Sequence, residues 1–367
     1  MKEFQTLKTD LTKTRIITND VEEVSLDQGE ITVRIEKFSF TSNNVTYGAA
    51  GDAIGYWNFF PPSEDQKNEW GCIPMWGFAE ITTSGNNELK VGERIFGYFP
   101  PGNFLTLSPI KVSNQSFFDG KDHRKELPAV YNNYLRLSGE EDYEKSMDNI
   151  RALLFPLHIT AFCLCDSLEE DSYLGASQVI IISASSKTGI GLAQGLAEKD
   201  RTPKIVGLTS KNNVDFVLSL GCYEEVISYD DLDQIDKGLG SVMIDMAGNQ
   251  AVLEALHNSL GSNMLKCLTV GMTHWNSGVT VNDALAQAAL QSKTEFFFAP
   301  SHIQKRVSDW GQEEFNKKTS AFMDRRAIES QSWMQIKEIS GLEEFLDTYN
   351  EVVRGNINPN EGIIVLP

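Results

Sequence analysis

The second half of the chain alternates short apolar runs with stretches of helical periodicity. Residues 179–182 form an unbroken β-branched run, as expected for a strand buried on both faces. Residues 192–197 then place apolar side chains at the spacing of a helix that buries one face. We expect five strands in this half, at residues 179–182, 204–208, 225–228, 241–245 and 265–271. Strands that alternate with helices predict an α/β fold with the doubly wound parallel sheet of a Rossmann domain.

The first part of the chain follows a different pattern, in which apolar and polar residues alternate. Residues 31–40 read ITVRIEKFSF, which is typical of a strand with one face in water. Residues 76–81 and 95–99 read as further strands, and residues 42–44 are expected to form a loop. This part therefore predicts an all-β domain, a small barrel or sandwich. Later in the chain we expect helices at 149–168 and around 303–323, and strands at 334–339 and 363–366.

Small polar residues separate the strand at 179–182 from the helix that follows it. A strand, a turn of small residues and a helix place a phosphate at the helix N-terminus, where free N–H groups and the helix dipole favour negative charge. We expect the following residues to hold the diphosphate of a nucleotide: Ser185, Ser186, Lys187, Thr188, Gly189 and Ile190. A triphosphate-binding P-loop is excluded, because residues 183–186 lack its glycines.

The end of the next strand favours one nicotinamide cofactor over the other. Folds that bind NAD usually carry an acidic residue about twenty positions after the glycine turn, where it binds the ribose 2′-hydroxyl. This chain has Thr209, Ser210 and Lys211 there, which offer two hydroxyls and a cation. That composition predicts a 2′-phosphate and therefore NADP(H), although Lys211 as an ordinary solvated lysine is the alternative. Four residues after later strands complete the expected cofactor contacts: Met246, Ala247, Gly271 and Thr273.

Composition and charge narrow the class of protein. The 367 residues suit two domains. The net charge of −19 argues against a duplex nucleic acid or an anionic membrane as a partner. The five cysteines are few and lie mostly in apolar runs, which is typical of reduced thiols in a cytoplasmic protein. We see no apolar signal region and no apolar run that approaches transmembrane length. The predicted partner is a small-molecule substrate, and a homodimer is left open.

The order of a β domain, a Rossmann domain and a short return segment resembles the medium-chain dehydrogenase/reductase superfamily. The match is carried by residues 87–99, 153–165, 183–194 and 339–366. Of these, residues 183–194 stand where the zinc-free, quinone-oxidoreductase-like branch has its cofactor-binding turn. A narrower resemblance is to a family of medium-chain-like proteins of unknown function, through PMWGFAEI, ELPAVYNNY, SASSKTGIGLA, LTSKNN, DMAGN and VGMTHW. The resemblance implies a GroES-like β domain at 1–157, an NADP-binding Rossmann domain at 158–300, and a segment at 301–367 that completes the first domain.

The chain departs from the zinc-dependent members of this superfamily at their metal ligands. A gapless reading places Ser42 at their cysteine and residues 75–77 (Met-Trp-Gly) at their Gly-His-Glu. The five histidines form no set with the spacing of zinc ligands, so we expect no metal. In the quinone-reductase-like branch, Tyr47 corresponds to a tyrosine that faces the nicotinamide, whereas the branch's Asn is Ser42 here. Tyr229 resembles the tyrosine that flanks the NADP 2′-phosphate.

Without a metal, reduction of a carbonyl needs hydrogen-bond donors at the developing oxyanion. Tyr47, Tyr131 and the amide of Asn132 are the catalytic candidates, although Tyr131 could instead simply cover the site. The sequence thus predicts a zinc-independent NADP(H)-dependent oxidoreductase that reduces a small carbonyl or an activated, quinone- or enone-like alkene between its domains. Two alternatives stay open: an NADP(H)-binding sensor or accessory subunit without turnover, and an enzyme that uses tightly held NADP as a redox relay.

Overall fold

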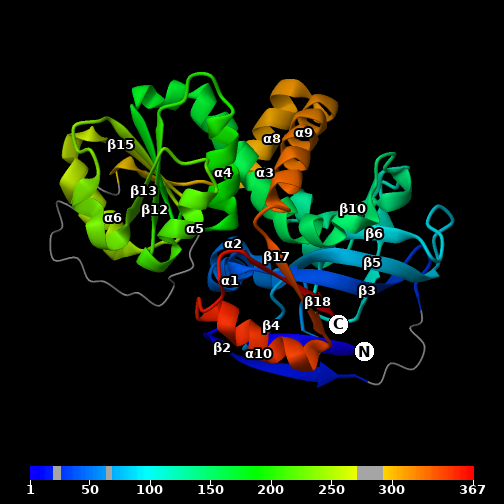
Figure 1. The fold of residues 1–367 in the computed structure, drawn as a ribbon. Coiled ribbons are helices and arrows are strands. Elements are labelled where there is room, and N and C mark those ends of the chain that lie inside the picture. Colours follow the sequence, from blue (N-terminus) through cyan, green and yellow to red (C-terminus); the bar gives the residue numbers. More distant parts are fainter. Residues whose placement is uncertain (20–25, 63–67, 271–291) are drawn as a thin grey trace. The chain divides into compact units, whose positions relative to one another are not determined.

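The computed structural model describes residues 1–19, 26–62, 68–270 and 292–367 (Figure 1). It divides the chain into two compact units. Unit 1 comprises Met1–Leu153 and Met334–Pro367, and unit 2 comprises Leu154–Trp333. The predicted division at 157/158 lies close to the first boundary. The second boundary differs, because residues 301–333 belong to unit 2 and not to the segment that returns to the first domain.

Unit 2 is built on a six-stranded parallel sheet. Its strands are β11 (Gln178–Ile182), β12 (Lys204–Thr209), β13 (Glu225–Ser228), β14 (Ser241–Asp245), β15 (Met264–Thr269) and β16 (Thr294–Phe296). Their order across the sheet is β13-β12-β11-β14-β15-β16, and every neighbouring pair is parallel. The chain therefore reverses its direction of winding between β11 and β14, as in a doubly wound Rossmann sheet. The prediction of fold class is confirmed for this unit.

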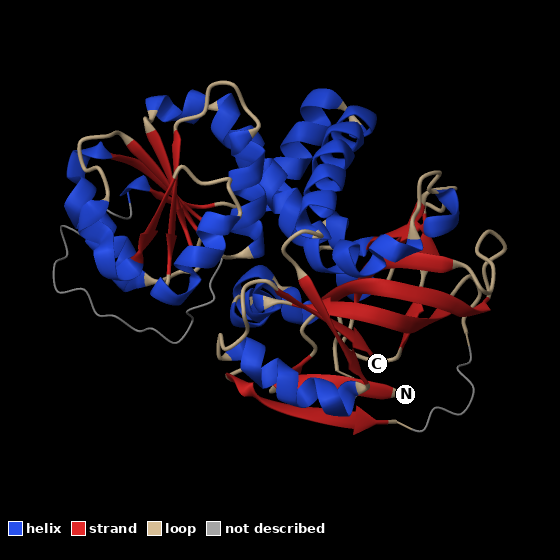
Figure 2. Cartoon of the chain, in the orientation of Figure 1, coloured by secondary structure: helices blue, strands red, loops and turns tan. Residues whose placement is uncertain are grey.

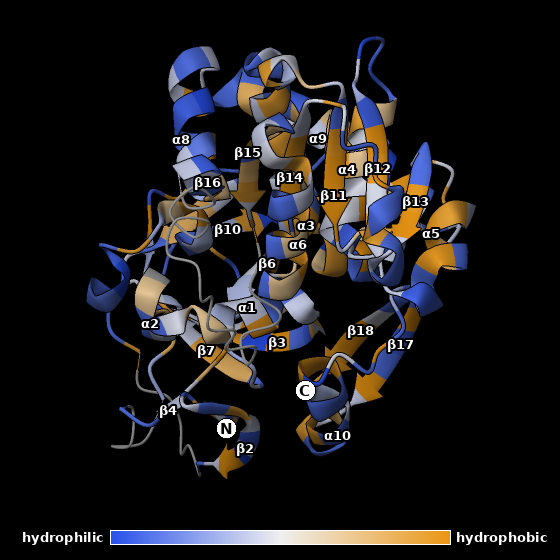
Figure 3. Cartoon of the chain, turned by 90° about the vertical axis from the view of Figure 1, so that its left-hand side faces the viewer, coloured by the Kyte–Doolittle hydropathy of each residue, from blue (hydrophilic) through white to orange (hydrophobic). Residues whose placement is uncertain are grey.

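Helices cover both faces of the sheet in unit 2 (Figure 2). The helices described for unit 2 are α4 (Lys187–Ala197), α5 (Val214–Ser219), α6 (Gln250–Leu260), α8 (Ala299–Trp310), α9 (Gln312–Ser330) and most of α3 (Asp148–Glu170). Alternate residues of β11 serve the two faces: Val179 and Ile181 pack with α3, α4 and α9, whereas Ile180 and Ile182 pack with α6. A strand buried on both faces has to be apolar throughout, which explains the unbroken run in the sequence and the hydrophobic strands in Figure 3.

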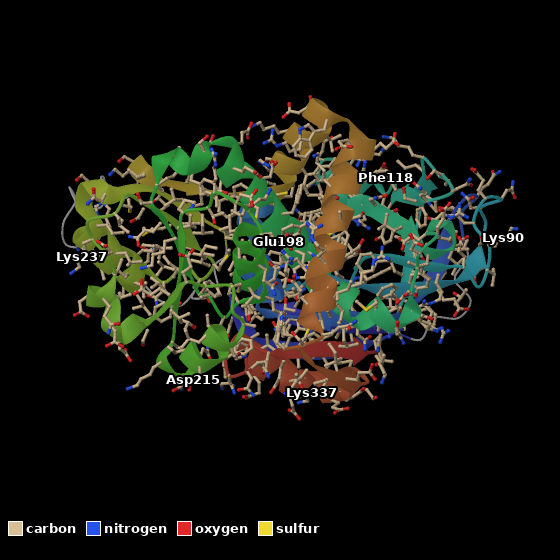
Figure 4. The ribbon with its side chains drawn as sticks, turned by 45° about the horizontal axis from the view of Figure 1, so that its top comes forward. Lys90, Phe118, Glu198, Asp215, Lys237 and Lys337 are labelled. Atoms are coloured by element: carbon tan, nitrogen blue, oxygen red, sulfur yellow. The ribbon has the colours of Figure 1, made fainter. Side chains whose placement is uncertain are left out.

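Helix α9 accounts for the displaced domain boundary. The ring of Phe322 packs into the core formed by α3, α4 and the sheet of unit 2, and it stacks edge-on against Phe162 of α3. Arg326, one turn later, pairs with Glu198 at the end of α4, a residue labelled in Figure 4. These contacts bind α9 to unit 2.

Unit 1 contains two antiparallel-rich sheets. The larger consists of β3 (Ile31–Phe40), β5 (Met75–Ser84), β6 (Arg94–Phe99), β7 (Phe104–Leu107), β8 (Pro109–Ile110), β9 (Ser116–Asp119), β10 (Asn133–Arg136), β17 (Gln335–Ser340) and β18 (Glu361–Leu366). The smaller consists of β1 (Lys2–Leu7), β2 (Asp10–Thr18) and β4 (Trp70–Gly71). Since β18 pairs with β3, the last segment of the chain completes the first domain, as predicted. The unit also holds the helices α1 (Ser42–Ala49), α2 (Gly51–Ile54) and α10 (Leu342–Val353).

One expectation about a helix was wrong. Residues 42–44 are not a loop but the first turn of α1. This helix starts because Thr41 and Asn44 form a capping box, in which each side chain accepts from a backbone N–H near the other. The helix at 145–170, which includes α3, is long and apolar enough to cross a membrane by length and composition, although 56% of its most apolar window is buried. The buried part packs in the core of unit 2, so its apolar character has a structural cause.

Candidate functional site

The carboxyl edge of the sheet in unit 2 carries the predicted nucleotide site. Strands β11 and β14 are neighbours although they are first and fourth in the chain order of the sheet, so their following loops diverge to opposite faces. Ligands of doubly wound sheets bind at this point of divergence. The turn at 183–186, which follows β11, and the loop at 246–249, which follows β14, lie there.

The turn after β11 has an unusual backbone. Ser183 has a φ of 66°, in the left-handed region that glycine enters freely and that costs other residues about 1–2 kcal/mol. The turn then closes through a hydrogen bond from Ser186 N to Ser183 O of 2.9 Å. Ser186 is the N-cap of α4, and its hydroxyl accepts from Gly189 N at 3.1 Å. Ser183 therefore adopts a backbone conformation that is more usual for glycine.

The start of α4 retains backbone N–H groups that could bind an anion. Gly189 N and Ile190 N are engaged by Ser186, whereas the N–H groups of Ser185 and Thr188 have no acceptor among the described residues. Free N–H groups at the N-terminus of an eleven-residue helix suit a phosphate. Lys187 lies half-buried at the first position of the helix and already has an interaction of its own. The structure thus brings the predicted residues 185–190 together.

The hydroxyl of Ser185 connects this turn to the end of β12. It lies 3.2 Å from Thr209 Oγ1 and 3.2 Å from Asn213 Nδ2, both of which donate to it. Ser185 and Thr209 were predicted at the site, but Asn213 was missed. The available signal was a polar side chain two positions after Lys211, in the short helix Lys211–Asn213 that begins where β12 ends.

Ser210 and Lys211 lie at the tip of the loop after β12, and both are exposed. Lys211 is not held by a salt bridge to any described residue. No carboxylate occupies residues 209–213, so the end of β12 offers hydroxyl, amide and ammonium groups. This arrangement fits a dianionic phosphate better than a ribose diol that needs an acceptor.

The loop after β14 is organised by a buried carboxylate. Asp245 is fully buried and accepts from Ala247 N at 2.9 Å and from Gly248 N at 3.0 Å. The predicted contacts Met246 and Ala247 are consequently held at the carboxyl edge, and both are buried. The other predicted contacts beyond β15, Gly271 and Thr273, lie outside the described residues.

Tyr229, which follows β13, lies against the turn rather than at the end of β12. Its hydroxyl oxygen accepts from Ser183 N at 2.9 Å. Burial raises the pKa of this phenol to about 12, and the hydrogen bond from Ser183 partly offsets the rise. The predicted position beside a 2′-phosphate is neither confirmed nor excluded by this contact, because the hydroxyl can still donate its own hydrogen.

Unit 1 holds the predicted catalytic tyrosines in a phenol cluster, which we define as Tyr47, Tyr56, Tyr98 and Tyr131. They come from four separate segments: α1, the turn Tyr56–Asn58, β6 and the turn Ala129–Asn132. The hydroxyls of Tyr56 and Tyr131 lie 3.0 Å apart. The rings of Tyr98 and Tyr131 have centroids 4.8 Å apart, and those of Tyr47 and Tyr131 are 6.4 Å apart. The sequence singled out Tyr47 and Tyr131 and missed the other two members.

Burial keeps these phenols protonated. It raises the pKa of Tyr47 to about 12, with hydrogen bonds to Trp76, Asn43 and Tyr131 opposing the rise. Burial also raises the pKa of Tyr131 well above its usual value. A neutral phenol in an apolar environment can donate a hydrogen bond to a developing negative charge. The side chain beside Tyr47 is that of Asn43, one position after the Ser42 that the resemblance aligns with the Asn of the quinone-reductase-like branch.

Asn132 has a different environment from the one expected. Its Oδ1 accepts from Arg124 Nε at 2.8 Å, and its Nδ2 donates to Arg124 O at 2.9 Å. Arg124 is 1% exposed and also binds Asp119, Tyr134 and the carbonyl oxygen of Tyr131. The Asn132 amide therefore holds a buried arginine, which in turn holds the backbone of Tyr131. The geometry favours this supporting role over the predicted oxyanion contact.

The indole of Trp57 is tightly packed within unit 1. A Cβ atom on Gly51 would lie 2.1 Å from the indole, and one on Gly71 would lie 2.3 Å from it. The ring is thus enclosed by two glycine backbones. Trp76 lies beside the phenol cluster, with its ring centroid 5.1 Å from that of Tyr98.

In the described part of the chain, no group of three or more His, Cys, Asp or Glu side chains is arranged to hold a metal ion. His274, one of the histidines considered in the sequence, falls outside it. The absence of zinc therefore stays a prediction.

The fold is similar to that of several solved oxidoreductase structures. The chain resembles CurA from Vibrio vulnificus crystallised with NADPH, with a TM-score of 0.65 and 14% identity over 100% of this chain and 99% of that one. The YhdH oxidoreductase from Salmonella enterica, in complex with NADP, gives a TM-score of 0.54 and 13% identity over 100% of both chains. The CurK enoyl reductase gives 0.52 and 12% over 96% and 95%.

These likenesses show the fold of the medium-chain dehydrogenase/reductase superfamily, a GroES-like domain joined to a Rossmann domain. No curated protein matches the sequence. The family described as "Protein of unknown function (DUF2855)" matches residues 38–358, which is most of the chain. The narrower resemblance noted in the sequence is thereby confirmed, and the chain belongs to the DUF2855 family, within the medium-chain dehydrogenase/reductase fold.

Proposed function

We propose that this protein is an NADPH-dependent oxidoreductase that reduces a small carbonyl or an activated alkene without zinc. The observation that carries the proposal is the carboxyl edge of unit 2. There, α4 is capped by Ser186, and the N–H groups of Ser185 and Thr188 have no acceptor in the described part of the chain. The neighbouring strand end has Lys211 and no acidic residue at positions 209–213. This combination fits a diphosphate and a 2′-phosphate at neighbouring points of one edge.

The residues present suggest how NADPH would be held. The N–H groups of Ser185 and Thr188 would bind the diphosphate, and Ser210 and Lys211 would bind the 2′-phosphate. Met246 and Ala247 would line the edge beyond β14. The bound nucleotide would supply a hydride, an electron pair with its hydrogen, to the substrate.

The phenol cluster would supply the proton that balances this reduction. Hydride transfer to a carbonyl carbon, or to the β-carbon of an activated alkene, leaves negative charge on the substrate oxygen. A phenol can donate a hydrogen bond to that oxygen and then its proton, and Tyr131 is the member we assign to this role. Tyr47, hydrogen-bonded to Tyr131, would orient it. The aromatic residues around these phenols would suit a small, largely apolar substrate.

The fold relatives support this class of reaction by what is known of them. One is crystallised with NADPH, one with NADP, and one is an enoyl reductase. Their identity to this chain is 12–14%, and their fold supports the proposed nucleotide and reaction class.

Nucleotide binding is the first test. We expect purified protein to bind NADPH more tightly than NADH in calorimetric titrations at low salt. Lys211→Glu should reduce or invert that preference, because it places a negative charge beside the expected 2′-phosphate. Lys237→Glu is the matched control, since it makes the same charge change at an exposed lysine of unit 2, in the loop that precedes β14 (Figure 4). Equal affinities for both nucleotides in the unmodified protein would contradict the 2′-phosphate assignment.

A binding protein without turnover is the second candidate, and one observation favours it. The Asn132 amide, a predicted oxyanion donor, is engaged by Arg124. Oxidation of NADPH over a panel of enones, quinones and aldehydes separates the two candidates. Consumption with any member supports the reductase, whereas binding without consumption supports a sensor or accessory subunit. NADPH that copurifies and is oxidised without net consumption would indicate a redox relay instead.

A further inference from the structure

Two tyrosine hydroxyls each form a hydrogen bond with the backbone of the turn after β11. The hydroxyl oxygen of Tyr229 accepts from Ser183 N at 2.9 Å. The hydroxyl of Tyr223 donates to Ala184 O, the next residue along the chain, at 2.8 Å. Tyr223 precedes β13 and Tyr229 follows it, so a single short strand anchors both side chains. We call these two contacts the tyrosine clamp.

The sequence makes room for this arrangement. A Cβ atom on Gly207 would lie 2.8 Å from the Tyr223 ring and 2.9 Å from Ala184 Cβ. Any larger residue in the middle of β12 would therefore displace Tyr223 from the turn. Ala184 N in turn donates to Leu208 O at 2.8 Å, which ties the turn to the same strand.

The residue at the centre of the tyrosine clamp is the one with the left-handed backbone. Ser183 has a φ of 66°, which a residue with a side chain adopts only when its surroundings fix it. Ser183 O also receives the hydrogen bond from Ser186 N that leads into α4. The conformation of Ser183 consequently sets where the N–H groups of Ser185 and Thr188 lie.

We infer that Tyr223 and Tyr229 are positioning residues for the nucleotide diphosphate, which act by holding Ser183 in its left-handed conformation. This inference rests on the nucleotide binding proposed above. This role of Tyr229 differs from contact with the 2′-phosphate. The hydrogen bond from Ser183 N to Tyr229 shapes the binding site of the diphosphate, which NADPH and NADH have in common. It also explains how the turn dispenses with a glycine at this position.

The two roles of Tyr229 make different predictions for binding. Tyr229→Phe removes the acceptor of Ser183 N, and loss of one such hydrogen bond is worth roughly a fivefold change in an equilibrium constant. The dissociation constants of NADPH and NADH should therefore rise by about the same factor. A second change, Ser183→Gly, should recover most of the loss, because glycine adopts a positive φ without help. A rise confined to NADPH, or no rise at all, would overturn the inference.

A second measurement does not depend on nucleotide binding. Hydrogen–deuterium exchange of a peptide that contains Ser183 should be slow in the unmodified protein and roughly fivefold faster in Tyr229→Phe. Tyr349→Phe is the matched control: it removes a buried hydroxyl that accepts from Thr6 in unit 1, and it should leave this peptide unchanged. Unchanged exchange in Tyr229→Phe would refute the tyrosine clamp. Should the unmodified protein bind neither nucleotide, the proposed function fails, and exchange still decides the tyrosine clamp.

Discussion

Side chains at the candidate site depend on partners from other segments of the chain. Tyr131 depends on Arg124 through its carbonyl oxygen and on Tyr56 through its hydroxyl. The sequence could suggest Tyr47 and Tyr131 by residue type and by resemblance. It could not reveal Tyr56, Tyr98 or the buried arginine, since their approach depends on how four separate segments fold together.

The role of Tyr131 can be tested by removing its hydroxyl alone. Tyr131→Phe should lower kcat/KM for any substrate that the protein reduces by about 10²-fold, because the proton donor to the substrate oxygen is lost. The affinity for NADPH should not change. Steady-state kinetics and titration give both values.

Tyr143→Phe provides the control for this change. Tyr143 belongs to unit 1, lies outside the phenol cluster and donates to Asp148 at 2.7 Å. Its loss should leave kcat/KM nearly intact. Unaltered turnover in Tyr131→Phe would return that residue to a purely structural role.

At the level of elements, strands buried on both faces were predicted closely and caps were not. The expected strand at residues 179–182 is β11 less one residue, and those at 225–228 and 241–245 coincide with β13 and β14. Their apolar runs leave little choice of structure. Helix α1 was missed because its start depends on the reciprocal capping of Thr41 and Asn44, while its polar residues and glycine read as a loop. The hairpin of β1 and β2 was also not anticipated.

Helix α4 supplies a prediction about packing between elements. A Cβ atom on Gly195 would lie 2.5 Å from the Phe322 ring of α9 and 2.8 Å from Cys165 Sγ of α3. Gly195→Ala gains about 1 kcal/mol of helix propensity, but overpacking costs about 1–3 kcal/mol. We therefore expect a net loss of about 1 kcal/mol in the free energy of unfolding by urea.

A compensating change identifies the cause of that loss. Phe322→Leu should be destabilising by itself, because it leaves a cavity in the core of unit 2. Combined with Gly195→Ala, it should cost less than the sum of the two single changes. Strict additivity would show that α9 does not limit the side chain at position 195.

At the level of the whole molecule, acid should destabilise the fold through a residue of α3. His158 is 2% exposed, and burial, with a smaller contribution from Arg326, lowers its pKa from 6.5 to about 3. Between these values the unfolded chain binds a proton that the folded protein excludes. Stability is therefore complete above pH 6.5 and falls as the pH decreases towards 3, by up to about 1.4 kcal/mol per pH unit.

The contribution of His158 can be isolated by comparing slopes. His158→Gln removes the titrating group, so its free energy of unfolding should vary less with pH between 6.5 and 4 than that of the unmodified protein. Chemical denaturation at several pH values measures both slopes. Parallel slopes would show that His158 accepts a proton in the folded state as readily as in the unfolded one.

The path of the chain through the two units constrains the order of folding during synthesis. Residues 1–153 are synthesised before unit 2, but β3 lacks its partner β18 until residues 361–366 have been synthesised as well. Unit 2 is synthesised in between, and the strands described for it are all available by then. The nascent protein therefore carries an unpaired edge on β3 while unit 2 is being synthesised. Because an unpaired strand edge can pair with other chains, we expect protection by chaperones to matter most in this interval.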